Sequence, residues 1–193
     1  MICPVVLAAG AGRRMGTNKL AEPLSGRPVV RHVVEALAAA GLPPPVVVLG
    51  HAPEAVRGAL EGLDVAFADA PDHADGMGRS LAAGIAALPA EAVAALVCLG
   101  DMPFIAPELL REIVSHAHAQ AIVAPVHAGQ RGHPVLWGSA FFPELRALQG
   151  DEGARRLFSV HADAVRLVPW DDDAIHVDID TPAALAAARA RFS

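Results

Sequence analysis

ICPVVLAAGAGRRMGTNK, residues 2–19, joins a short apolar run to a loop that combines three glycines with three cations. The apolar run, residues 2–7, is typical of a buried β-strand. Glycines let the loop backbone turn tightly and bring its N–H groups close to an anion, and the cations add positive charge. The loop is therefore predicted to hold a polyphosphate. Its glycines are Gly10, Gly12 and Gly16, and its cations are Arg13, Arg14 and Lys19.

The spacing of these glycines separates the loop from two common phosphate-binding motifs. A P-loop needs four residues between its glycines and a Lys-Ser or Lys-Thr pair directly after the second. The dinucleotide fingerprint GxGxxG needs two residues before its third glycine, whereas three separate Gly12 from Gly16. The loop therefore favours a triphosphate over a dinucleotide.

Composition narrows the class of protein. A chain of 193 residues can bury roughly 70% of the surface that its unfolded state exposes, and we expect one domain, residues 1–193. A net charge of −6 argues against general nucleic-acid binding, which needs an excess of cations on one face. No apolar run approaches the length of a membrane span, and the N-terminus lacks the features of a signal peptide. We expect a cytoplasmic protein that binds neither nucleic acid nor membranes.

Two cysteines occur, Cys3 and Cys98, and both lie in apolar runs. Such cysteines are expected to be inert buried thiols rather than redox or metal-binding groups.

Strand and helix patterns alternate along the chain. This alternation predicts an α/β fold with a mostly parallel, Rossmann-like sheet between two layers of helices. Strands are predicted at residues 2–7, 46–49, 65–68, 94–99, 122–126, 134–137 and 165–168. Amphipathic helices are predicted at residues 28–40, 53–60, 78–88, 107–117 and 182–191.

A metal ligand is predicted at the end of the fourth strand. In an open sheet of this kind, ligands bind beyond the carboxyl ends of the strands where the winding direction reverses. If the first three strands wind one way, the fourth packs beside the first, which places Asp101 next to the glycine-rich loop. Mg²⁺ takes one or two carboxylates and completes its shell with phosphates and water. Asp101 is therefore expected to hold Mg²⁺ on a triphosphate.

Five motifs together resemble the MobA-like nucleotidyltransferases, in particular the molybdenum cofactor cytidylyltransferase branch. They are LAAGAGRRMGTNK (7–19), LGDMP (99–103), RGHPVLW (131–137), GDEGAR (150–155) and DIDTP (178–182). The resemblance implies transfer of CMP from CTP to the terminal phosphate of molybdopterin. It also implies the fold of the nucleotide-diphospho-sugar transferases, with one antiparallel strand, and transient contact with a recipient molybdoenzyme apoprotein or its chaperone.

The resemblance assigns the nucleotide to two segments. Arg13, Lys19 and Asp101 are the expected catalytic residues. The guanylyl-transferring relatives read LAGG where this chain has LAAG, so the methyl group of Ala9 is expected to disfavour a purine. The remaining nucleotide-binding candidates are Leu7, Ala8, Gly10, Gly12 and Arg14 in the first segment, and Gly76, Gly78 and Ser80 in the second.

The resemblance also suggests acceptor and metal residues. Arg131, His133, Asp151 and Arg155 are the acceptor candidates. Asp180 is the expected second metal ligand opposite Asp101. Asp178 stays an alternative, because both flank Ile179 and fall on one side of an extended segment.

Catalysis should need no general base, because the second pKa of a phosphomonoester is about 6. In-line attack on the α-phosphorus is then helped by positioning and charge neutralisation alone.

Other functions remain open from the sequence. A pyridine-dye reductase branch of the same family uses a nicotinamide cofactor, and a nucleotide-binding regulator without turnover would keep the same loop. Guanylyl transfer and other nucleotidyl transfers also fit the first motif. The combination of Arg13, Arg14, Lys19 and Asp101 favours metal-triphosphate chemistry, since hydride transfer needs no metal carboxylate.

Overall fold

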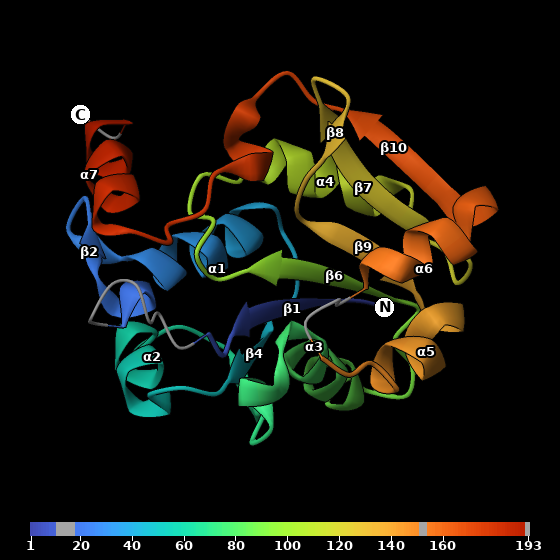
Figure 1. Ribbon diagram of the computed structural model, residues 1–193, viewed down its shortest axis with the longest axis horizontal. Coiled ribbons are helices and arrows are strands. Elements are labelled where there is room, and N and C mark those ends of the chain that lie inside the picture. The colour runs from blue at the N-terminus through green and yellow to red at the C-terminus, as the bar shows by residue number, and fades with distance from the viewer. Residues whose placement is uncertain (11–17, 151–153, 192–193) are drawn as a thin grey trace.

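A mixed sheet forms the centre of the molecule in the computed structural model, which describes residues 1–10, 18–150 and 154–191. The strand order is β10-β7-β9-β6-β1-β4-β5, with β8 added to β7 (Figure 1). The strands are β1 (Ile2–Ala8), β4 (Val46–Leu49), β5 (Ala66–Asp69), β6 (Ala94–Leu99), β7 (Ile122–His127), β8 (Gln130–Arg131), β9 (Val135–Gly138) and β10 (Val165–Pro169). A separate two-residue hairpin pairs β2 (Pro23–Leu24) with β3 (Arg27–Pro28).

The pairing of the strands confirms the predicted winding. The sheet begins at β1, and β4 and β5 follow on one side of it in parallel. The next long strand, β6, crosses over to pair with β1 on the other side. One strand, β9, is antiparallel to both of its neighbours, as the family resemblance implied.

Helices cover both faces of the sheet. The predicted helices are present as α1 (Val29–Ala39), α2 (Pro53–Ala59), α3 (Met77–Ala86), α4 (Pro107–Ser115) and α7 (Pro182–Arg191). The sequence did not reveal α5 (Phe142–Arg146) and α6 (Arg155–Val160), nor the 3₁₀ turns η1 (Lys19–Ala21), η2 (His73–Asp75), η3 (Ser139–Phe141), η4 (Ala162–Ala164) and η5 (Asp173–His176). These elements are too short for a helical period to show.

Two apolar layers hold the helices on the sheet. One layer packs α1, α2 and α4 through residues such as Val33, Val56 and Leu109, and the other packs α3, α5 and α6 through residues such as Ile85 and Leu145. No helix in the described ranges is both long and apolar enough to cross a membrane.

Both cysteines are buried free thiols. Burial raises the pKa of Cys98 to about 12, so this thiol is not ionised near neutral pH.

Two helical glycines provide a test of how α3 packs. A Cβ at Gly84 in α3 would lie 2.6 Å from Val5 Cγ1 and 2.9 Å from Val48 Cγ2, whereas a Cβ at Gly58 in α2 would meet nothing within 4 Å. We expect Gly84→Ala to lower the free energy of unfolding by about 1–3 kcal/mol through overpacking. The matched Gly58→Ala should raise it by about 0.5–1 kcal/mol through helix propensity.

Urea denaturation measures both changes. If Gly84→Ala is as stable as Gly58→Ala, the close approach of α3 to β1 and β4 is wrong.

Candidate metal and nucleotide site

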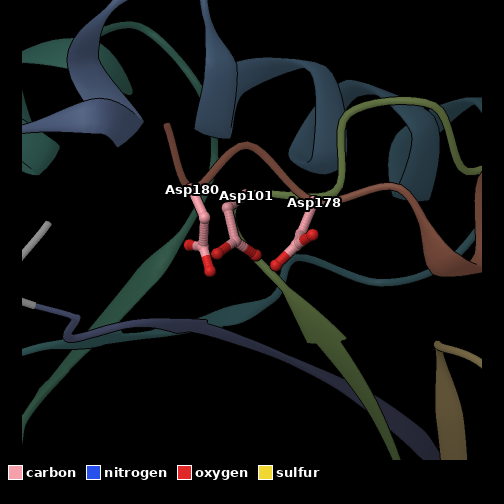
Figure 2. Close-up of side chains that lie close together, drawn as sticks. All are labelled: Asp101, Asp178 and Asp180. Atoms are coloured by element: carbon pink, nitrogen blue, oxygen red, sulfur yellow. The ribbon is translucent and has the colours of Figure 1, made fainter. Parts of the chain in front are cut away.

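Three carboxylates converge beyond the carboxyl end of β6. One oxygen each from Asp101, Asp178 and Asp180 can be chosen so that all lie within 4.8 Å of one another. Figure 2 shows the carboxyl groups of Asp178 and Asp180 on either side of Asp101, with all three carboxyl groups pointing the same way. Asp178 is exposed, and the other two are partly buried. The structure therefore brings both acidic candidates of DIDTP to Asp101.

Backbone contacts explain this convergence. Gly100 N donates to Leu7 O at 2.9 Å, which sets the residue before Asp101 against the end of β1. Ile179 N then donates to Asp101 O at 3.0 Å. The Ile179 side chain is fully buried, so the carboxylates on either side of it face the other way.

The segment then enters α7 at a capped turn. Thr181 Oγ1 accepts from Ala184 N at 3.1 Å, as expected of an N-cap residue before Pro182.

Lys19, the only lysine of the chain, reaches into the same cluster. Its Nζ lies 2.6 Å from Asp101 Oδ2 and also pairs with Asp180 Oδ1. The residue is 8% exposed, and it is the only charged residue in the described ranges that is buried. Burial lowers the pKa of Lys19, but the charges and hydrogen bonds of Asp101 and Asp180 outweigh it, and the pKa is raised.

The charge of the cluster favours a further cation. Although Asp178 is exposed as a residue, partial desolvation of its carboxyl group raises its pKa, and the neighbouring carboxylates Asp180 and Asp101 raise it further. Among the described residues of this cluster, the three carboxylates are accompanied by one positive charge, that of Lys19, so negative charge is in excess. All the donors are hard carboxylate oxygens, which suit Mg²⁺ or Mn²⁺.

The loop after β1 lies beside this cluster. Ala8 and Ala9 are buried, Leu7 O accepts from Gly100, and Ala9 O accepts from His51 N at 3.2 Å. Gly10 is exposed, with open space where a Cβ would be. The predicted residues Gly12, Arg13 and Arg14 lie outside the described residues.

The second predicted nucleotide segment begins α3. Gly76 has φ of +116°, a conformation that favours glycine. Gly78 N donates to Gly150 O at 3.1 Å, and a Cβ at Gly78 would lie 2.9 Å from that oxygen. Ser80 is buried in the first turns of α3. Gly78 thus holds the start of α3 against the beginning of the GDEGAR motif.

The acceptor candidates separate into two groups. His133 and Arg155, the first residue of α6, interact electrostatically, and Asp101 also acts on His133. Arg131 instead stacks over Phe158 of α6, with its guanidinium carbon 4.2 Å from the ring centroid. Asp151 lies outside the described residues.

His133 carries a buried polar atom, Nδ1, without a hydrogen-bond partner among the described residues. Burial lowers the pKa of His133 to about 4; Asp101 opposes this shift, and Arg155 and His176 add to it. The folded protein therefore resists protonation between pH 6.5 and about 4, whereas the unfolded chain accepts the proton. Stability should fall as the pH drops through this window, by up to about 3 kcal/mol.

We expect His133→Asn to remove this part of the pH dependence, as measured by urea denaturation at pH 7 and pH 5. His51→Asn, at an exposed histidine, serves as the control. Equal pH dependence in the wild type and His133→Asn would contradict the burial of a neutral imidazole.

The model of the MobA-like NTP transferase domain matches residues 4–165. The chain belongs to this family. The family is one of NTP transferases, so it implies a nucleoside triphosphate substrate.

Solved structures of similar proteins cover the whole chain. A nucleotidyl transferase from Methanothermobacter thermautotroptrophicus is 29% identical with a TM-score of 0.86, over 100% of this chain and 97% of that protein. Rv0371c from Mycobacterium tuberculosis is 31% identical with a TM-score of 0.85, over 98% of each chain. Rv0371c has also been solved as a complex with manganese.

The fold itself is shared more widely. The 4-diphosphocytidyl-2C-methyl-D-erythritol synthase of Anaerococcus prevotii has a TM-score of 0.79 at 16% identity, over 99% of this chain and 97% of that protein. The expected nucleotide-diphospho-sugar transferase fold is confirmed.

Curated relatives are longer. The bifunctional protein GlmU of Exiguobacterium sp. strain AT1b is 32% identical over 162 residues, which are 83% of this chain and 34% of GlmU. The chain spans about a third of the length of the first such relatives.

Proposed function

We propose that the protein transfers CMP from CTP to the terminal phosphate of molybdopterin and releases pyrophosphate. The observation that carries this proposal is the group formed by Lys19 and the three carboxylates beside the loop after β1. Nucleotidyl transfer depends on positioning and charge neutralisation, and it needs no nucleophile from the protein.

The carboxylates fit a divalent metal. Asp101 and Asp180 are the proposed ligands, since they are the partly buried members of the cluster and share Lys19. A bound Mg²⁺ would neutralise charge on the phosphates. The manganese complex of Rv0371c supports a divalent ion in this family.

Lys19 and Arg13 are the proposed cations for the leaving pyrophosphate. Lys19 already lies among the carboxylates, so its ammonium can pass from Asp101 and Asp180 to phosphate oxygens without crossing the molecule. Its raised pKa keeps the amine charged at neutral pH.

Ala9 supports CTP over GTP. Its methyl group lies 2.7 Å from the position that a Cβ at Gly50 would take, so it fills the bare face of Gly50. A methyl here narrows the space for a base, a difference worth about 1–3 kcal/mol per methylene.

The acceptor candidates His133 and Arg155 favour an acceptor phosphate that is already ionised. With a pKa of about 4, His133 is uncharged at neutral pH and offers hydrogen bonds rather than charge. Arg155 supplies the positive charge. Molybdopterin fits because its phosphate is already largely a dianion at pH 7.

Pyrophosphate release with each of four nucleoside triphosphates, with and without molybdopterin, tests the proposal. The expected result is release with CTP, Mg²⁺ and molybdopterin together. Release with GTP but not with CTP would show that the nucleotide substrate is GTP. Release that does not require molybdopterin would show that the acceptor is another molecule. NADPH oxidation with a dye acceptor and no pyrophosphate release would favour the reductase alternative.

A further inference from the structure

A histidine that no motif singled out lies against the end of β1 and β4. Gly50 follows β4, and a Cβ built there would lie 2.6 Å from His73 Cγ and 2.7 Å from Ala9 Cβ. The imidazole ring and the methyl group of Ala9 therefore share the bare face of Gly50. Any side chain at position 50 would displace one of them.

His73 also connects the two segments expected to hold the nucleotide. It begins η2, and its carbonyl accepts from Gly76 N at 3.3 Å just before α3 starts. The ring also lies near Ala9 of the loop after β1, because both meet the same point at Gly50. His73 is therefore close to residues 7–10 in space and is bonded through its backbone to the start of residues 76–80.

The hydrogen bonding of the ring fixes what it can offer a ligand. His73 Nδ1 lies 2.9 Å from Ala70 O. A carbonyl oxygen only accepts, so Nδ1 carries the proton, and in the uncharged ring Nε2 is left as a hydrogen-bond acceptor. Nε2 has no hydrogen-bond partner among the described residues, and the side chain is partly exposed.

We propose that His73 selects a nucleobase with an amino group at position 4 of a pyrimidine, or at position 6 of a purine, by accepting a hydrogen bond from that group at Nε2. This inference rests on the proposed function, because it takes residues 7–10 and 76–80 as the nucleotide site. Cytosine carries an amino group where uracil carries a carbonyl, and adenine and guanine differ in the same way. The amino group donates to Nε2, whereas a carbonyl oxygen would face it lone pair to lone pair. In this proposal Ala9 discriminates between bases by their size, and His73 discriminates by the hydrogen-bonding group on the edge of the base.

Equilibrium binding of CTP, UTP, ATP and GTP in the presence of Mg²⁺ tests this selection. We expect the wild type to bind CTP at least about tenfold more tightly than UTP, the effect of one hydrogen bond gained or lost. ATP should exceed GTP in the same direction. His73→Phe keeps a ring against Gly50 but lacks the acceptor, so the ratio of CTP to UTP affinity should fall to near one. His116→Phe, at the end of α4, should keep the wild-type ratio.

Three results would overturn the inference: equal affinity of the wild type for CTP and UTP, no nucleotide binding, or a wild-type ratio in a folded His73→Phe. Should His73→Phe not fold, ¹⁵N spectra of the wild-type histidine rings decide. The Nε2 resonance of His73 should shift with CTP and not with UTP, and no shift with CTP overturns the inference. The proposed function fails separately, if CTP binds more tightly than UTP but molybdopterin yields no pyrophosphate.

Discussion

Replacing Asp101 by Asn is expected to lower metal-dependent pyrophosphate release on the order of 10³-fold, because the variant removes a charge from the centre of the carboxylate cluster. Asp101 is the residue that Lys19 Nζ approaches at 2.6 Å and the one whose backbone carbonyl anchors Ile179. The amide keeps the shape of the side chain, so the loss reports on charge. Steady-state pyrophosphate release and Mn²⁺ titration followed by electron paramagnetic resonance measure the two effects.

The neighbouring carboxylates sharpen this experiment. Asp180→Asn should resemble Asp101→Asn. Asp178→Asn should lower the rate by about tenfold, since Asp178 is exposed and forms no ion pair with Lys19 among the described residues. Glu91→Gln, an exposed position before the amino end of β6, should behave as the wild type. A severe Asp178→Asn with a mild Asp180→Asn would make Asp178 the second ligand, and a fully active Asp101→Asn would refute the metal site.

Lys19→Met should lose turnover while gaining affinity for a metal. The lost ammonium removes stabilisation of the leaving pyrophosphate, which we expect to cost about 10²–10³-fold in rate. The same ammonium pairs with Asp101 and Asp180 in the structure, so its removal frees both carboxylates for Mn²⁺ in the absence of nucleotide. Mn²⁺ titration without nucleotide and pyrophosphate release are measured on the same samples.

A misfolded variant would lose both activity and metal binding. A lower rate together with a higher Mn²⁺ affinity would therefore not be explained by damage to the fold. Arg111→Met serves as the control, because Arg111 pairs with Glu108 on α4. A parallel loss of metal binding and turnover in Lys19→Met would show that Lys19 supports the metal site rather than competing with the ion.

The sequence predicted the parts of this site that depend on strand ends. The apolar runs at residues 2–7 and 94–99 place Asp101 beside the loop after β1 by topology alone, and the pairing of β1 with β6 confirms it. The approach of DIDTP to Asp101 was expected only from the family resemblance, because it depends on a contact between Ile179 and Asp101.

Other features of the site depend on contacts between residues far apart in the sequence, so no local pattern predicts them. Lys19 was expected on phosphate oxygens, whereas its ion pair with Asp180 joins residues 161 positions apart. Arg131 was expected at the acceptor. Its stacking on Phe158 depends on α6, a helix too short to show a helical period in the sequence. His73 and Gly50 were missed for the same reason: their contact is purely tertiary. The one available signal was a glycine directly after the strand at residues 46–49.

Because Lys19 is the only lysine in the sequence, it can be labelled selectively. Of the 15 lysine and arginine residues in this sequence, Lys19 alone carries a primary amine. A reagent that acylates lysine side chains therefore has one target in this sequence, and that target lies inside the carboxylate cluster. The rate at which Lys19 takes up such a label, followed by mass spectrometry, would report whether its amine is held by the carboxylates, covered by nucleotide or free.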